Sequence, residues 1–157
     1  MHISNLANRN VHTCSADDTL ESAARVMWEA DVGCLVVVDN EHHPIAMITD
    51  RDVAMAAYTQ GSCLRDIPVR HAMSRRLLAC RADSAVGEAE ALMQREQIRR
   101  LPVVSDQGEL VGIVALGDLA RDAFSSPIRM PLAIPGLAKT LAAVTERRAA
   151  ETVKAAE

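Results

Sequence analysis

Apolar residues along the first half of the chain predict the order helix, strand, strand, helix. Four apolar side chains within residues 20–27 recur at i, i+3, i+4 and i+7, the spacing of one buried helical face. Residues 35–38 form a continuous apolar run rich in β-branched side chains, which a turn signal ends, and residues 45–48 form a second run. A further helix is expected to begin at about residue 49.

The same pattern returns later in the chain. Shifting the sequence against itself by 66 positions aligns 48 residue pairs without a gap, beginning with Val11 on Leu77, and 11 of these pairs are identical. About three identities are expected from typical composition. The repeat therefore indicates a duplicated structural unit. Its first helix is expected to be capped by Asp17 or Asp18.

We predict an α+β fold made of two β-α-β-β-α repeats, residues 1–62 and 63–124, followed by a tail, residues 125–157. One unit of about 55 residues buries too little apolar area to be comfortably stable. The two repeats are therefore expected to pack sheet to sheet around a pseudo-twofold axis. This packing would create two equivalent clefts between the repeats, and such clefts often hold small ligands.

The tail differs in composition from the repeats. Pro127, Pro131 and Pro135 are expected to break regular structure before an Ala-rich helix over residues 137–157. An isolated helix with so thin an apolar stripe is marginal. Docking on its own module or on a second chain would stabilise it, and a frayed end without function is an equally weighted alternative.

Composition and charge exclude several classes of protein. Aromatic residues make up only 2% of the chain and the net charge is −4, so stacking on single-stranded nucleic acid and binding to duplexes are both disfavoured. The first ten residues lack the apolar core of a signal peptide, and no apolar stretch reaches the roughly 18 residues of a membrane span. We expect a cytoplasmic protein that contacts neither nucleic acid nor membrane.

Catalytic and metal-binding motifs are missing from the sequence. It contains no G-x-S-x-G, P-loop, H-E-x-x-H or Gly-x-Gly-x-x-Gly pattern. The four cysteines are too widely spaced for a C-x-x-C pair and are interpreted as small apolar residues. His42 and His43 are weak metal candidates because no further ligand lies at a suitable spacing. We therefore expect no enzyme activity, no required cofactor and no metal.

Two segments carry a resemblance to a known family. The segments at residues 33–53 and 98–119 read GCLVVVDNEHHPIAMITDRDV and IRRLPVVSDQGELVGIVALGDL, and they resemble the second halves of two CBS domains. The resemblance covers about residues 1–124 and implies a disc-like pair that often dimerises. It also implies a regulatory, energy-sensing role with an adenosyl ligand (AMP, ADP, ATP, NAD or S-adenosylmethionine) in the clefts, exerted on a partner protein in trans.

The resemblance implies a ribose site at Thr49 and Asp52, because the family places a hydroxyl at the end of the last strand and an acid three residues later. A carboxylate can accept hydrogen bonds from both ribose hydroxyls. The same spacing is also a helix capping box. In the second repeat Asp118 persists but Ala115 replaces the hydroxyl. An acid without a capping partner favours a ligand role, and Thr49/Asp52 is expected to be the better site.

Arg99 and Arg100 precede the strand of the second repeat, where similar domains often direct a basic residue at ligand phosphates across the cleft. Solvated side chains at a helix end are the alternative. The first repeat has Gly33 and Cys34 at these positions. We therefore expect phosphate to be bound asymmetrically, from the second repeat only.

The remaining pocket walls implied by the resemblance come from the segment that leads into each repeat. These lead-in segments are Ile3–Leu6 for the first repeat and Val69–Met73 for the second, and backbone groups there would read the adenine edge. His71 takes a position that is often acidic, where it could tune a pH response; an exposed loop histidine without a role is the favoured alternative. The implied contacts are Ser4, Leu6, Val69, His71 and Ala72. A structural or protein-interaction module with empty clefts remains the alternative function.

Overall fold

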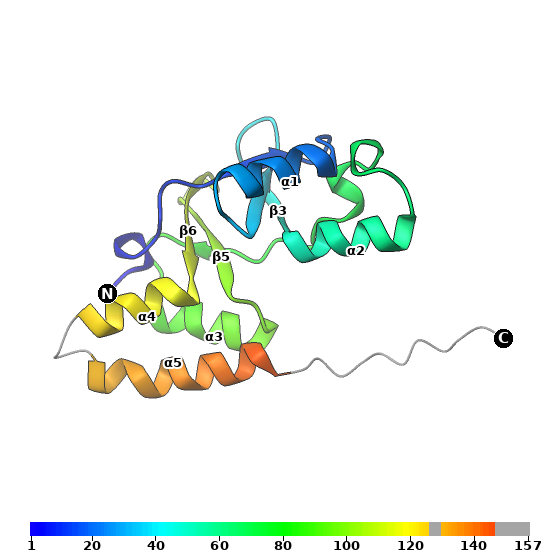
Figure 1. Cartoon of the computed structure of the whole chain (residues 1–157). Helices are drawn as coiled ribbons and strands as arrows, with labels where there is room; N and C mark the ends of the chain where they lie inside the picture. Colours follow the sequence, from blue (N-terminus) through cyan, green and yellow to red (C-terminus); the bar gives the residue numbers. More distant parts are fainter. Residues whose placement is uncertain (126–129, 147–157) are drawn as a thin grey trace.

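The computed structural model describes residues 1–125 and 130–146, and the side chains of all of these residues except 130–132. Two repeats of alternating strands and helices are followed by one long helix (Figure 1). The first repeat contains η1 (Ile3–Asn5), β1 (Thr13–Ser15), α1 (Leu20–Glu29), β2 (Cys34–Val38), β3 (Pro44–Thr49) and α2 (Asp50–Gln60). The rest contains η2 (Leu64–Asp66), η3 (Val69–His71), β4 (Cys80–Arg81), α3 (Val86–Glu96), β5 (Arg100–Val104), β6 (Leu110–Ala115), α4 (Leu116–Ser125) and α5 (Met130–Thr145).

Each repeat folds as a mixed sheet of three strands with two helices. β1 runs parallel to β2, which pairs antiparallel with β3, and the order β4-β5-β6 repeats this arrangement. The pairing Cys14 with Val37 recurs as Cys80 with Val103, the same register 66 positions later. The predicted fold class, α+β with two β-α-β-β-α repeats and a C-terminal helix, is confirmed.

The strands lie between the helices of the two repeats. Figure 1 places α1 and α2 on one side of the strands and α3, α4 and α5 on the other. Leu35 and Val37 point toward the helices of their repeat and belong to its core. Val36 and Pro102 alternate with such core residues yet are buried as well. Because successive strand residues face opposite sides of a sheet, their burial requires cover from the other sheet.

The lead-in segments exchange places between the repeats. Ile3 is fully buried in the core of the second repeat, and its N–H donates to the carbonyl of Ser84 at 3.0 Å. Val69 is fully buried in the core of the first repeat, and its N–H donates to the carbonyl of Asp18 at 2.8 Å. Both bonds are related by the same 66-position shift. Each repeat therefore completes its core with a segment from outside its own β-α-β-β-α unit.

The caps of the first helices differ from the prediction. Thr19, rather than Asp17 or Asp18, caps α1 by accepting from the N–H of Ser22. Asp18 is unavailable because its carboxylate accepts from the N–H of Ser15 at 2.8 Å. In the second repeat the corresponding cap position is Ala85, which provides no side-chain bond. The expected aspartate cap was therefore wrong.

The tail helix docks on the second repeat. α5 runs beside α3 and α4 (Figure 1), and Leu137 and Val144 pack against the second core. Gln94 of α3 donates to the hydroxyl of Thr140 at 2.8 Å, and Thr140 is fully buried. This contact agrees with the first of the predicted docking modes, on its own module. Residues 147–157 of the predicted helix lie outside the described part of the chain.

Two prolines lie inside α5, so the prediction that Pro131 and Pro135 break regular structure was wrong. Pro131 is the second residue of the helix, where a missing N–H costs nothing because the first N–H groups have no helical partner. Pro135 removes one bond of the second turn. The third proline of that prediction, Pro127, lies outside the described residues. None of the helices in the described ranges is long and apolar enough to cross a membrane.

Removing the side chain of Ile3 is expected to destabilise the chain by about 2–5 kcal/mol, because Ile3→Ala leaves a cavity in a core that other elements cannot refill. Equilibrium urea unfolding measures this change. Ile45→Ala is the matched control, since Ile45 is 39% exposed, and its expected cost is about 0.5 kcal/mol. An equal loss of unfolding free energy in the two variants would contradict the role of Ile3 in the core of the second repeat.

Glu90 on α3 lies under α5, where a Cβ at Gly136 would come within 3.3 Å of its carboxylate. Burial raises the pKa of Glu90 above its ordinary value of 4.5. A raised carboxyl pKa favours folding below pH 4.5, and this contribution is lost as pH rises through the folded-state pKa. Glu90→Gln should therefore stabilise the chain at neutral pH and have no such effect near pH 4. Thermal unfolding across this range measures the difference, and a pH-independent effect would contradict it.

Candidate functional site

A capping box closes the N-terminus of α2. The hydroxyl of Thr49 accepts from the N–H of Asp52 at 3.3 Å and donates to Oδ2 of Asp52 at 2.7 Å. The N–H of Thr49 donates to the same oxygen at 2.8 Å. No described residue donates a hydrogen bond to Oδ1 of Asp52. One carboxylate oxygen thus fixes the helix end while the other is available, so the capping and ligand interpretations are compatible.

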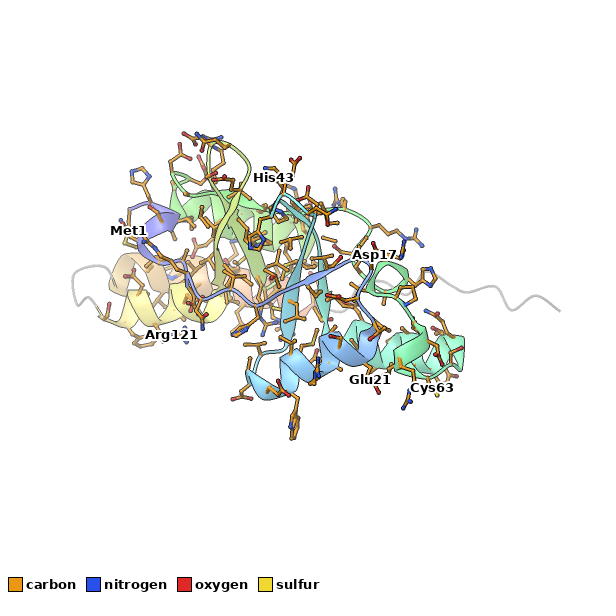
Figure 2. All side chains as sticks on the ribbon, turned by 90° about the horizontal axis from the view of Figure 1, so that it is seen from above. Met1, Asp17, Glu21, His43, Cys63 and Arg121 are labelled. Atoms are coloured by element: carbon orange, nitrogen blue, oxygen red, sulfur yellow. The ribbon has the colours of Figure 1, made fainter. Side chains whose placement is uncertain are left out.

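Asp118 also caps its helix, although the Thr49 equivalent is Ala115. The N–H of Ala115 donates to Oδ2 of Asp118 at 2.7 Å, so the argument that Asp118 lacks a capping role was wrong: the backbone amide suffices without the hydroxyl. Oδ1 of Asp118 is bound by the guanidinium of Arg121, which lies on the outer side of α4 (Figure 2). Both oxygens of the Asp118 carboxylate are therefore engaged within the second repeat, whereas Oδ1 of Asp52 accepts no hydrogen bond from the described residues.

The lead-in segments reach the last strands of the repeats on which they pack. The N–H of Ser74 donates to the carbonyl of Met47 in β3 at 2.8 Å, and the N–H of Asn8 donates to the carbonyl of Ile113 in β6 at 2.9 Å. The expectation that residues 3–6 serve the first repeat and 69–73 the second was therefore wrong, because the segments are exchanged. Val69, His71 and Ala72 therefore pack on the repeat that carries Thr49 and Asp52. Ser4 and Leu6 pack on the repeat that carries Ala115 and Asp118.

Backbone amides in these segments are already engaged. The N–H of Val69 donates to Asp18, that of His71 to Pro68, and that of Ala72 to Val69. Ser4 likewise donates to the carbonyl of Ala82 at 2.9 Å. The side chain of Val69 is fully buried, whereas His71 is exposed. Any contact with a ligand at these positions must therefore use carbonyl oxygens or the side chains of the exposed residues.

Arg100 extends from β5 to the first repeat. Its Nη2 would lie 3.8 Å from a Cβ placed on Gly33, and Oδ2 of Asp50 would lie 3.3 Å from the same atom. Burial raises the pKa of the neighbouring Cys34 thiol; the charge of Arg100 lowers that pKa and the charge of Asp50 raises it. Arg99 is exposed. The predicted reach across the repeat boundary therefore has a geometric basis for Arg100.

Two hollows each lie beside a pair of helices. One of about 570 Å³ extends from Arg99, Arg100 and Ala115 along α4 to α5, and one of about 360 Å³ lies between α1 and α2. Neither is lined by Thr49 or Asp52. The sequence left open whether the tail docks on its own module, docks on a second chain or frays, so the α5 wall of the larger hollow could not be placed from it.

The other polar groups singled out by sequence have structural surroundings. His43 lies in a turn with its ring nitrogen 3.5 Å from Asp39 and 3.7 Å from Glu41. Within residues 1–125 and 130–146, no three His, Cys, Asp or Glu side chains gather as a metal site. Three cysteines are buried and free, as expected of small apolar residues, but Cys63 is exposed after α2 (Figure 2).

The CBS domain family model matches residues 3–58 and 65–124. An uncharacterized protein of Methanopyrus kandleri is 36% identical, over 74% of this chain and 60% of its own length. The CBS domain-containing protein YhcV of Bacillus subtilis is 42% identical, over 74% of this chain and 81% of its own. The solved CBS domain pair of protein MJ0100, in complex with 5-methylthioadenosine and S-adenosyl-L-methionine, superposes with a TM-score of 0.71 at 22% identity, covering 80% of this chain and 97% of that one.

Replacing Asp52 separates its two roles. Asp52→Ala removes the side-chain acceptor at the start of α2 and should cost about 1 kcal/mol of stability. Asp52→Asn keeps an amide oxygen for the N–H of Thr49 and should cost about half of that or less. Urea unfolding of the two variants measures the difference. If Asn proved as costly as Ala, the charge rather than the cap would carry the stabilisation.

Proposed function

This chain belongs to the CBS domain family, and on that premise we propose that it is a regulatory module that senses an adenosyl compound. The candidates are AMP, ADP, ATP, NAD and S-adenosylmethionine, bound in the clefts between the repeats. The module has no catalytic activity of its own, forms a homodimer in the cytoplasm, and acts on a partner protein in trans.

The observation that carries this proposal is the state of the Asp52 carboxylate. Oδ2 is held by the capping box, which fixes the orientation of the group, and Oδ1 accepts no hydrogen bond from the described residues. A fixed carboxylate with an open oxygen suits the paired hydroxyls of a ribose. The helix N-terminus beside it favours negative charge, such as a phosphate.

Arg100 supports the same proposal from the opposite repeat. Its guanidinium lies near Gly33, and Gly33 adjoins Cys34, the strand partner of Thr49. A cation at this distance from the ribose site can meet a phosphate or a carboxylate of the ligand. The complex of the MJ0100 domain pair with two adenosyl compounds supports the ligand class.

An interaction module with empty clefts is the second candidate. It is favoured by the use of Asp52 and Asp118 as helix caps in both repeats and by the internal hydrogen bonds of the lead-in amides. Under this function the same residues serve the fold alone, and no adenosyl compound binds.

Thermal unfolding of the purified chain with AMP, ADP, ATP, NAD, S-adenosylmethionine and GTP tests the proposal. A ligand that binds only the folded state adds about 2.7 kcal/mol at 100 times its dissociation constant, which raises the midpoint by several degrees. We expect one adenosyl compound to raise it selectively, and Asp52→Asn to abolish the shift.

Asp118→Asn is the matched control, because it makes the same change at the position where Arg121 already binds the carboxylate. It should retain most of the shift. No stabilisation by any adenosyl compound would favour the interaction module, and a shift that survives Asp52→Asn would move the ribose site elsewhere.

A further inference from the structure

The larger hollow is built from two helices that are distant in sequence. Leu116, Ala120 and Phe124 recur every four residues along α4 and form one wall. Residues of α5 form the opposite wall, including Ile134, Leu137 and Leu141. The volume of about 570 Å³ is within the range of pockets that hold small molecules. Its long walls are apolar, so the body of any occupant must also be apolar.

The mouth of this hollow is basic. Arg99 and Arg100 lie at the end where α4 begins. Within the described residues neither guanidinium has a carboxylate at ion-pair distance, although Asp50 lies on the same side of Gly33 as Arg100. One end of the hollow therefore suits an anion.

The first repeat provides an internal comparison. Its hollow of about 360 Å³ lies between α1 and α2 and includes Asp31, Gly33 and Asp50. The 66-position shift maps Gly33 onto Arg99 and Asp50 onto Leu116. The two hollows share only these two equivalent positions. Where the second repeat has Arg99, the first has an uncharged glycine, so the basic mouth is not a requirement of the fold.

We propose that the hollow between α4 and α5 binds a single-chain amphipathic anion. A carboxylate or phosphate head group lies at Arg99 and Arg100, and an unbranched hydrocarbon tail lies between Phe124 and Leu141. Burying a hydrocarbon chain contributes about 0.8 kcal/mol per methylene group, and two guanidiniums select the charged head. This ligand class is separate from the adenosyl compound of the proposed function.

The two ligands would share Arg100 but not the rest of their sites. Arg100 lies near Gly33 of the first repeat and also at the mouth of the α4–α5 hollow. An anionic head group bound there would compete with the phosphate of an adenosyl ligand for the same guanidinium. Through Arg100, binding under α5 would weaken binding in the cleft.

Isothermal titration of the full chain with laurate and, in parallel, with dodecyl phosphate tests the proposal and distinguishes the two head groups. We expect saturable binding of one molecule per chain by at least one of them. The neutral analogue dodecanol should bind at least about tenfold more weakly than either anion, because a hydrogen bond to a charged group contributes about 1.5–3 kcal/mol.

Variants test the two ends separately. Arg100→Gln should lower the affinity for the anion about tenfold. It should not disturb the fold, because the side chain is at the surface of the hollow. Ala138→Trp should fill the hollow and abolish binding of the tail. Ala142→Trp is the matched control, because Ala142 is exposed on the same helix and does not line the hollow.

The proposal is overturned if neither amphiphile binds below its micelle concentration, or if binding is indifferent to both Arg100→Gln and Ala138→Trp. Asp52→Asn should leave laurate binding unchanged, so failure of the adenosyl proposal and failure of this one give different results. Competition between laurate and any adenosyl ligand found would follow from the shared arginine.

Discussion

Neither repeat completes its hydrophobic core from its own β-α-β-β-α unit. Ile3 fills the core of the second repeat and Val69 fills that of the first, each with no exposed surface. The exchange is held by backbone hydrogen bonds at equivalent positions. Since the side chains of both segments are buried in the opposite core, unfolding one repeat removes part of the other. The pair must therefore behave as one cooperative unit.

The exchange also decides where a ligand can meet both repeats. The lead-in segment that follows the first repeat passes the end of β3, where the N–H of Met47 donates to the hydroxyl of Ser74 at 3.1 Å. Thr49 ends the same strand, Asp52 lies in the first turn of α2, and Arg100 approaches from the second repeat. These groups meet only when both repeats are assembled. A ligand there would bind the assembled pair and stabilise it as a whole.

Sequence periodicity was sufficient to predict the repeated elements and their order, because buried positions such as Leu35 and Leu101 recur at the same shift. It could not predict the exchange, since a segment that packs on its own repeat and one that packs on the other have the same local pattern. The helix cap at Thr19 was missed because Asp18 makes a local bond to Ser15, and such competition is decided by geometry rather than by residue type.

The surface that α5 covers is polar, so the sequence did not favour docking on its own module over docking on a second chain. Glu90 and Gln94 of α3 and Gln97 just after it recur at i, i+4 and i+7, a pattern typical of a solvated face. In the structure Gln94 donates to Thr140, and Gln97 donates to the carbonyl of Ala143 at 3.3 Å. The larger hollow exists only because α5 lies there. Because the docking partner of the tail helix was left open, this apolar wall could not be placed from the sequence, whereas the basic pair at its mouth could be singled out.

The pairs that match between the repeats and those that differ occupy different parts of the fold. Cys14 and Cys80 are identical and buried, as are Leu35 and Leu101, because core packing tolerates little change. Three neighbouring changes in charge lie at the strand and helix ends, where Gly33 and Cys34 correspond to Arg99 and Arg100, and Asp50 to Leu116. Apart from Cys34, these positions line the two hollows. Arg99 and Arg100 belong to neither hydrophobic core, so their charge concerns what the larger hollow can hold rather than how the second repeat folds.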